Sequence, residues 1–443
     1  TVKSALGFEA RVEQGQYKSS AIQDLGLTRS AARPSPGGGY EVDADYYEVS
    51  VPLMGGDVTL PFIASLVVDY SSRTIDNSIA GSYDVDATSL NWRVMDDLAI
   101  RVSEQTAVKA PDLGDLFLPQ ITTFSTAADP CDYRYRDVGR NPEQRRANCD
   151  AEGIPADFIS NVVNATAQGV TGGNPNLINE VADTKSTGLV YQPSWWGDVL
   201  FGSASFAVDY IEIELTDYVT SYSLTQNMNA CYDYDTYPNS QFCDSFSRDA
   251  EFQVDDFATG LINAGLIDFA TYVWKADWAF DVSELASFVS RENVAMDLGS
   301  MAIRYRATQE DFFASADSGA AEDLRSATGQ FGNDEWFYDT QFEWAYQDWY
   351  VYVQGNSRSG GVIDIDRVYD DEYLGYDGQP IFEFDGYTSW NGGVGYRVND
   401  GTTLRVNVSN LFDYDGTEDD VFTPEADLLF YGRSVTASMN VRF

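Results

Sequence analysis

The C-terminal segment alternates strictly between apolar and polar side chains, and this pattern restricts the fold more than any other feature of the chain. The apolar row consists of Val435, Ala437, Met439, Val441 and Phe443. The polar row consists of Ser434, Thr436, Ser438, Asn440 and Arg442. Alternation of period two predicts a β-strand with one apolar and one polar face. Such a strand separates a core from water in a soluble sandwich, or lipid from a polar lumen in an outer-membrane barrel.

The same alternation recurs along the chain and predicts about fourteen antiparallel strands. It is clearest in residues 46–51, 63–70, 88–94, 98–102, 184–191, 204–210, 341–346, 349–353, 390–397 and 404–408. Two further strands are expected around 266–282 and 293–306.

The connections between these strands differ in length in a regular way. Short turns are expected near 54–57, 95–97, 196–198, 347–348 and 399–401. Long polar loops are expected near 16–42, 109–180, 218–262, 307–332, 358–384 and 412–430. Outer-membrane barrels have short turns at the periplasmic end and long loops outside, whereas a soluble sandwich has no reason to keep every second connection short. The sequence therefore predicts an all-β fold, a transmembrane antiparallel β-barrel, in which 109–180 and 218–262 are long extracellular loops.

The composition excludes several classes of function. Lys and Arg number 27 against 70 Asp and Glu, a formal charge of −43. Nucleic acid is therefore excluded as a partner, because phosphate binding needs a basic surface. The chain has no histidine, which excludes Ser-His-Asp catalysis and His-ligated metals. Aromatic residues make up 14% of the chain, as aromatic girdles at two membrane interfaces would require.

The four cysteines form two local pairs, Cys131 with Cys149 and Cys231 with Cys243, in polar segments outside the expected strands. Free thiols and a zinc site made of all four thiolates are the alternatives. Two loop disulfides in an oxidising compartment are the favoured interpretation, because the pairs lack CxxC spacing and lie in separate loops.

Several short motifs follow one another in a consistent order. They are 7–11 (GFEAR), 46–53 (YYEVSVPL), 101–117 (RVSEQTAVKAPDLGDLF), 172–177 (GGNPNL), 208–213 (VDYIEI) and 410–413 (NLFD). Together with the terminal strand, they make the chain similar to the C-terminal part of TonB-dependent outer-membrane receptors. That resemblance implies a 22-stranded barrel closed around an N-terminal plug domain. This chain (residues 1–443) carries no plug and no TonB box, so we expect it to be the C-terminal portion of such a barrel.

Candidate site residues are few. Loop aromatics that could stack against a sugar or aromatic ligand are Tyr232, Tyr234, Tyr237, Trp336 and Tyr338, with girdle or loop packing as the alternative. Weak candidates for Ca²⁺ are Asp413, Asp415, Asp419 and Asp420, which lack EF-hand spacing, with plain solvation as the alternative. Arginines expected on the lumen face are Arg93, Arg101, Arg397, Arg405 and Arg442. No catalytic residues and no other cofactor are predicted.

The sequence thus predicts an outer-membrane receptor that takes up a scarce nutrient, energised through TonB. The resemblance implies contact with the TonB complex through the absent N-terminal part, besides contact with the bilayer and lipopolysaccharide. The acidity favours a neutral oligosaccharide, a peptide or a cationic chelate over an anionic ferric siderophore. Two alternatives stay open: a secreted Ca²⁺-binding structural or adhesive β-protein, and a carboxylate-dependent carbohydrate-active enzyme.

Overall fold

The protein is built around one large antiparallel sheet, as seen in a computed structural model that describes residues 1–29, 31–56, 60–292, 294–316, 324–330, 332–362, 383–414 and 432–442. Fourteen strands follow one another in sequence order across the sheet, which confirms the predicted count, and the short β14 (Arg325–Ser326) pairs with β13 beside this path. The strands are β1 (Lys3–Gln16), β2 (Gly37–Met54), β3 (Ser65–Asn77), β4 (Gly81–Met95), β5 (Leu98–Lys109), β8 (Glu180–Tyr191), β9 (Ser203–Ser221), β12 (Leu261–Asp281), β13 (Ser300–Ala316), β15 (Trp336–Tyr346), β16 (Trp349–Arg358), β19 (Tyr387–Asn399), β20 (Thr402–Ser409) and β21 (Ser434–Val441).

The strand register carries the apolar row of each strand onto one continuous face. Met439 pairs with Leu404, which pairs with Tyr396, and Ala437, Val406 and Val394 form the next row. Residues directly opposite one another in neighbouring strands point to the same face. No second sheet covers this face in the described chain, where Met439 is 65% exposed and Val406 44% exposed. This arrangement excludes the soluble sandwich, which would bury both residues.

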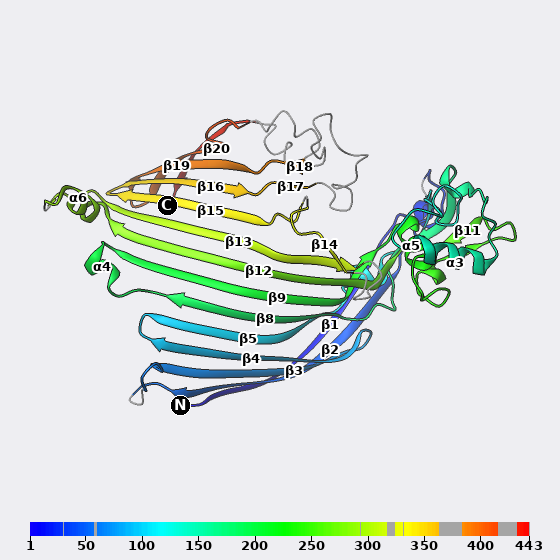
Figure 1. Ribbon diagram of the computed structural model, residues 1–443, viewed down its shortest axis with the longest axis horizontal. Helices are drawn as coiled ribbons and strands as arrows, with labels where there is room; N and C mark the ends of the chain where they lie inside the picture. The colour runs from blue at the N-terminus through cyan, green and yellow to red at the C-terminus, as the bar shows by residue number, and fades with distance from the viewer. Residues whose placement is uncertain are drawn as a thin grey trace.

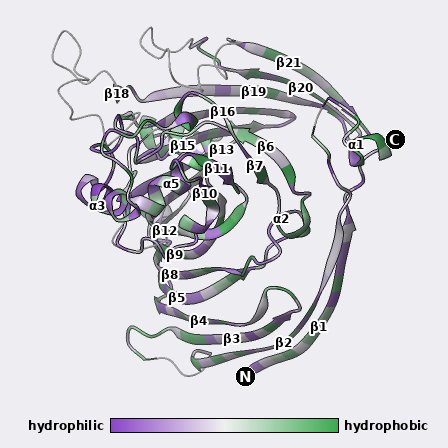
Figure 2. Cartoon of the chain, turned by 90° about the vertical axis from the view of Figure 1, so that its right-hand side faces the viewer, coloured by the Kyte–Doolittle hydropathy of each residue, from purple (hydrophilic) through white to green (hydrophobic). Residues whose placement is uncertain are grey.

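The apolar face is the convex one. Tyr40 and Val42 lie on the opposite face, since they share the parity of Glu48 and Ser50 along β2. Both pack against Leu116 of the short helix α2 (Leu113–Phe117). Figure 2 shows the sheet curving around an interior that holds α2. We call the convex apolar face the outer face and the concave polar face the inner face.

Aromatic side chains border the apolar band of the outer face at two levels. The lower girdle lies at the end that carries both chain termini in Figure 1 and includes Trp92, Trp278, Trp344, Trp349 and Tyr396. The upper girdle lies toward the long loops and includes Tyr47, Tyr70, Tyr210, Tyr272, Tyr305 and Tyr338. Two such girdles around an apolar band are typical of outer-membrane barrels.

The sheet is an open arc over the described residues. Its two edges are β1 and β21, and no ladder joins them among those residues. None of the helices in the described part of the chain has the length and apolarity needed to cross a membrane.

Most connections follow the predicted asymmetry, and three features differ. The β3–β4 connection (78–80) is short although it lies at the long-loop end, and β13 continues to Ala316 through part of the predicted loop 307–332. At the opposite end, 282–299 is a long connection that contains α6 (Val282–Ser290), where a strand had been expected from 293. Apolar residues in α6 recur at helical rather than strand spacing, which a period-two reading overlooks.

The predicted loops 109–180 and 218–262 fold together at one end of the sheet (Figure 1). Residues 110–179 and 222–260 are named the cap. The cap contains α2, β6 (Ile121–Ser125), α3 (Pro142–Glu152), η1 (Asn161–Val163), β7 (Ala167–Thr171), α5 (Leu224–Tyr232), η2 (Cys243–Ser245), β10 (Phe246–Arg248) and β11 (Val254–Phe257). Elsewhere lie α1 (Ala21–Asp24), α4 (Trp196–Val199), β17 (Gly361–Val362) and β18 (Glu383–Phe384).

Candidate functional site

Charged side chains divide unequally between the two faces of the sheet. Between the upper girdle and the long loops the outer face carries acids, namely Glu41, Asp43, Asp45, Asp76, Asp84, Asp86, Glu104, Asp183, Glu212, Glu214 and Asp268. Most strand cations lie on the inner face, namely Lys3, Arg11, Arg73, Arg93, Arg101, Lys109, Lys275, Arg304, Arg306, Arg358, Arg397 and Arg405. Within the sheet, negative charge therefore predominates on the outer face, whereas the inner face carries charges of both signs.

The inner face is lined by ion pairs that join strands of the sheet, and Arg101 of β5 reaches across β8 to Asp209 of β9. The guanidinium of Arg101 contacts the carboxylate of Asp209 at 2.6 Å, and the Lys275 ammonium lies 3.9 Å from the same carboxylate. Arg306 with Asp277 (2.7 Å) and Arg304 with Glu343 (2.6 Å) repeat the arrangement. These pairs are solvated and each contributes at most about 1 kcal/mol to stability. They present both signs of charge to anything that crosses the interior.

The predicted lumen arginines agree with this arrangement. The strand register places Arg93, Arg101, Arg397 and Arg405 on the inner face. Arg442 follows the end of β21, where its backbone nitrogen donates to the carbonyl oxygen of Gly401 at 2.7 Å.

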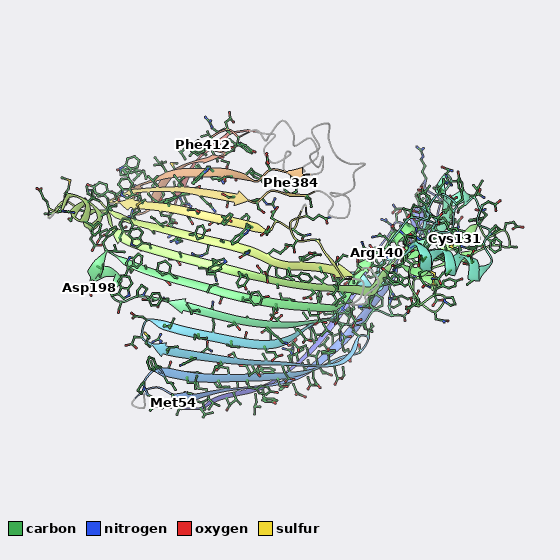
Figure 3. All side chains as sticks on the ribbon, viewed as in Figure 1. Met54, Cys131, Arg140, Asp198, Phe384 and Phe412 are labelled. Atoms are coloured by element: carbon green, nitrogen blue, oxygen red, sulfur yellow. A yellow bond between two sulfur atoms is a disulfide. The ribbon has the colours of Figure 1, made fainter. Side chains whose placement is uncertain are left out.

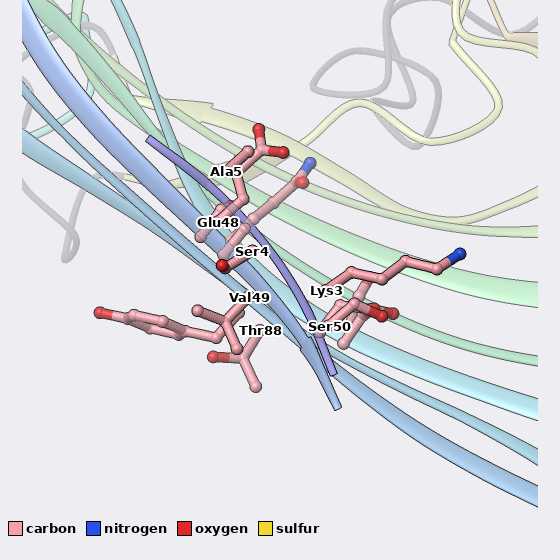
Figure 4. Close-up of a pocket in the computed structure, with 14 residues that line it drawn as sticks. Lys3, Ser4, Ala5, Glu48, Val49, Ser50 and Thr88 are labelled. Atoms are coloured by element: carbon pink, nitrogen blue, oxygen red, sulfur yellow. The ribbon is translucent and has the colours of Figure 1, made fainter. Parts of the chain in front are cut away.

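A wide polar hollow of about 570 Å³ lies across the inner face of β1 to β5. Its floor is made of hydroxyl groups from Ser50, Ser71, Ser89 and Ser103, with Glu48 at one side. Figure 4 shows Lys3 and Glu48 on one side of the sheet and Val49 and Thr88 on the other. The hollow resembles the wall of an aqueous passage more than an enclosed ligand site, since it is open and lined by small polar groups.

The cap has its own hydrophobic core, built from residues that are far apart in the chain. Residues of 110–179 (Ile154, Phe158) pack with residues of 222–264 (Tyr222, Tyr232, Phe242). The two predicted disulfides are confirmed: Cys131 pairs with Cys149, and Cys231 pairs with Cys243. Cys131 is labelled within the cap in Figure 3. The two long loops are therefore one folded body rather than two independent loops.

Buried ion pairs also tie the two halves of the cap together. Arg248 donates to both carboxylate oxygens of Asp129 at 2.8 Å, and its side chain is 4% exposed while that of Asp129 is fully buried. Arg145 contacts Asp233 at 2.6 Å through a second buried pair. Burial alone would lower the pKa of Arg248, but the hydrogen bonds and negative charge of Asp129 raise it overall. Both buried pairs are charged and bidentate, which specifies how the two halves fit.

A third carboxylate in the cap is held ionised. Burial would raise the pKa of Asp132, but hydrogen bonds from the Arg134 guanidinium and from the backbone nitrogens of Arg134 and Ser160 lower it overall. Asp132 thereby anchors the chain on both sides of α3.

The predicted ligand-contact tyrosines lie together in the cap. Tyr232 is 1% exposed, stacks on Tyr237 at 5.4 Å, and donates its hydroxyl hydrogen to Glu152. Tyr234 and Tyr237 are half-buried beside the same core. Burial, with Glu152 beside it, raises the pKa of Tyr237 to about 12. Tyr232 has almost no surface for a ligand and serves the cap core, whereas ligand contact by Tyr234 and Tyr237 stays a prediction.

Trp336 and Tyr338 lie apart from the tyrosines of the cap. They stack at 5.4 Å along β15, on the same parity as Phe342 and Trp344 of the outer face. This position agrees with the girdle alternative and points both side chains away from the interior.

Of the candidate calcium aspartates, only Asp413 lies among the described residues. In the described part of the chain no group of three or more acidic or cysteine side chains could hold a metal ion. Asp413 accepts a hydrogen bond from the Arg433 backbone nitrogen at 2.7 Å. Asp415, Asp419 and Asp420 lie outside the described residues.

A smaller pocket of about 440 Å³ lies at the long-loop end of the sheet, where the β1–β2 loop meets the connections 110–179 and 222–260. We call this end the mouth and the pocket the mouth pocket. The β1–β2 loop contributes Tyr17, Lys18 and Arg33, while the rest of the chain contributes apolar and small residues that include Leu118, Ile121 and Leu261. No acidic side chain is among the described residues that line it. Sequence reasoning missed this pocket, although residues 17–36 hold Lys18, Arg29 and Arg33 against one acid in a strongly acidic chain.

Comparisons with known proteins agree with the observed architecture. A family model described as TonB dependent receptor-like, beta-barrel, matches residues 4–411. No curated protein matches the chain. Among solved structures, a mutant of the ferric enterobactin receptor PfeA from Pseudomonas aeruginosa is similar with a TM-score of 0.58 and 12% identity, over 100% of this chain and 51% of that one. The siderophore receptor PirA from Acinetobacter baumannii is similar with a TM-score of 0.57 and 14% identity, over 100% and 52% of the two chains. The chain thus spans about half the length of these receptors.

Proposed function

Because the chain belongs to the TonB-dependent receptor β-barrel family, we propose that it forms part of the wall and the mouth of a receptor for uptake of an anionic iron chelate. Members of this family are outer-membrane β-barrel transporters of Gram-negative bacteria and are not enzymes. That membership removes the carbohydrate-active enzyme and the secreted adhesive protein as alternatives.

The mouth pocket is the observation that supports an anionic substrate. Lys18 and Arg33 line it together with the Tyr17 ring and apolar side chains, with no acid among the described lining residues. Such a pocket favours a negatively charged ligand with an aromatic or apolar part. The preference for a neutral or cationic substrate came from net charge alone. Eleven of the acids that contribute to that charge lie on the outer face of the sheet, away from this pocket.

The receptors that share this fold are described as binding siderophores, which are chelates of this chemical class. In the proposed account the loops at the long-loop end, including 109–180 and 218–262, face the outside and admit the substrate. The ion pairs of the inner face then present both positive and negative groups to the substrate along the passage. Energy from the TonB complex is supplied through the part of the receptor that precedes this chain.

A binding titration of the complete receptor tests this proposal. Ferric catecholate and ferric hydroxamate chelates are titrated into the purified protein, and the double variant Lys18→Gln/Arg33→Gln is compared with Lys185→Gln. Lys185→Gln is the control because this substitution removes a positive charge from the outer face of the sheet. Each charged contact in a half-open pocket is worth about 1 to 1.5 kcal/mol, so the double variant should weaken binding by roughly 30- to 150-fold.

The control should bind within about twofold of the unmodified receptor, since its charge is remote and screened. Equal affinities of the double variant and the control for every chelate would refute the anionic-substrate proposal.

A further inference from the structure

Three connections at the end of the sheet opposite the cap fold back onto the outer face. They lie between β2 and β3, β8 and β9, and β12 and β13, and their described residues are 55–56 with 60–64, 192–202, and 282–292 with 294–299. Figure 1 shows α4 and α6, which belong to two of them, at this end, and Figure 3 labels Asp198 of α4 there. We call these three connections the skirt.

The same contact holds each skirt connection to the outer face. The indole nitrogen of Trp92 donates to the carbonyl oxygen of Phe62 at 2.9 Å. Trp278 donates in the same way to Phe201 at 3.0 Å, and Trp344 donates to Leu298 at 2.9 Å. All three tryptophans belong to the lower girdle. A buried or interfacial indole N–H normally finds a partner, and here the partner is in each case the connection itself.

Aromatic packing fixes the part of the skirt that contains α4 and α6. The ring of Phe201, 6% exposed, lies 4.8 Å from Trp278 and 5.4 Å from Phe288 of α6. Trp196 of α4 lies 5.4 Å from Phe206, another outer-face residue. The skirt therefore packs against the apolar band of the outer face and extends this apolar surface beyond the strand ends.

The skirt also carries large apolar side chains that stay exposed. Its large exposed residues are Leu60, Phe62, Trp195, Val199, Phe288, Val289 and Met296, of which Val289 is 72% exposed. The other three connections at this end are tight turns with polar tips, as in Asp96–Asp97 and Gln347–Asp348. Contiguous exposed apolar surface marks an interaction site, and among the connections at this end it occurs in the three that pack against the outer face.

We propose that the skirt is a membrane-interface anchor that inserts its apolar side into the inner leaflet of the outer membrane. This inference rests on the proposed function, which places the apolar band in lipid and the short turns in the periplasm. Lipid is the expected occupant because the skirt is continuous with that band and begins at its lower aromatic girdle. The α6 helix fits this role, with Leu285, Phe288 and Val289 set against serines and Glu284, the pattern of a helix that lies in the interface plane. The skirt then sets the depth of the β8–β13 wall in the bilayer.

Site-directed spin labelling of the complete receptor in phospholipid vesicles tests the anchor. Single cysteines are introduced as Val289→Cys, Val199→Cys, Asp96→Cys and Val406→Cys, and collision rates of the nitroxide with oxygen and with a water-soluble nickel complex are measured. The four native cysteines are all in disulfides and do not react. Asp96 is the matched control at the same end, on a polar turn, and Val406 is the control within the apolar band.

The anchor predicts that labels at 289 and 199 collide more with oxygen than with nickel, as at 406, and that the label at 96 shows the reverse. Nickel accessibility at 289 and 199 equal to that at 96 would overturn the anchor while leaving the barrel intact. Protection of 289 and 199 from both reagents would also overturn it, because it indicates a covering protein rather than lipid. Nickel accessibility at 406 would instead refute the proposed function.

Discussion

Removing the negative charge of Asp129 should open the cap while leaving the sheet intact. Asp129→Asn keeps a side-chain oxygen that can accept from the Cys131 backbone nitrogen, but it removes the carboxylate that pairs with both arms of the buried Arg248 guanidinium and leaves only the Glu152 carboxylate, at 3.9 Å. Both side chains are almost completely buried, so solvent does not screen the loss. Leaving one member of a buried ion pair unpaired costs about 3 to 5 kcal/mol, which corresponds to a roughly 150- to 4,000-fold rise in the open population of the cap.

Amide hydrogen exchange measures this change directly. Exchange of peptides within 110–179 and 222–260 is compared among the unmodified receptor, Asp129→Asn and Asp137→Asn. Asp137 is a matched control in the same cap, where it forms an exposed pair with Arg146. An exposed pair contributes at most about 1 kcal/mol, so the control should raise exchange less than about fivefold. If both variants exchange alike, the buried pair does not hold the cap together and the reasoning is wrong.

Two further predictions concern alkaline pH and close packing. Because the pKa of Tyr237 is raised to about 12 in the cap and is about 10 in an unfolded chain, the cap should lose stability as pH rises from about 10 through 12. Tyr237→Phe should remove this part of the alkaline loss, and absorbance at 295 nm should show one late-titrating phenol fewer in that variant. Gly188→Ala would place a methyl group 2.0 Å from the Asp209 carboxylate, whereas the nearest atom at Gly395 is 3.8 Å away. The first substitution should lower the melting temperature more than Gly395→Ala, and equal melting temperatures would contradict the close approach.

The sheet could be predicted from the sequence because its signal is local. The side on which a residue such as Met439 or Val406 lies depends on its parity within a few neighbours, so alternation predicts face and strand together. Turns such as Asn399–Gly401 are equally local. The α6 helix was missed because its nine residues follow a strand without a break and lack a hydrogen-bonded side-chain cap.

The cap and the mouth pocket could not be predicted, because they depend on residues far apart in the chain. Asp129 and Arg248 are 119 residues apart, and nothing near either one indicates the other. Tyr232, Tyr234 and Tyr237 were predicted as ligand contacts with loop packing as the alternative, and only the fold shows that Tyr232 supports a core. Net charge alone is a weak guide to the substrate, because a sum over the chain does not record that most strand cations lie on the inner face.

The central claim is that the apolar outer face contacts lipid. It is tested by the loss of folding free energy when an arginine is placed on the outer or on the inner face of the same strand. Val406→Arg and Asn407→Arg stand next to each other in β20 and point to opposite faces. Folding free energies of the two variants in phospholipid vesicles should differ, with a cost of about 2 to 4 kcal/mol at 406 and close to none at 407. An equal cost at both positions, or a larger cost at 407, would contradict the account.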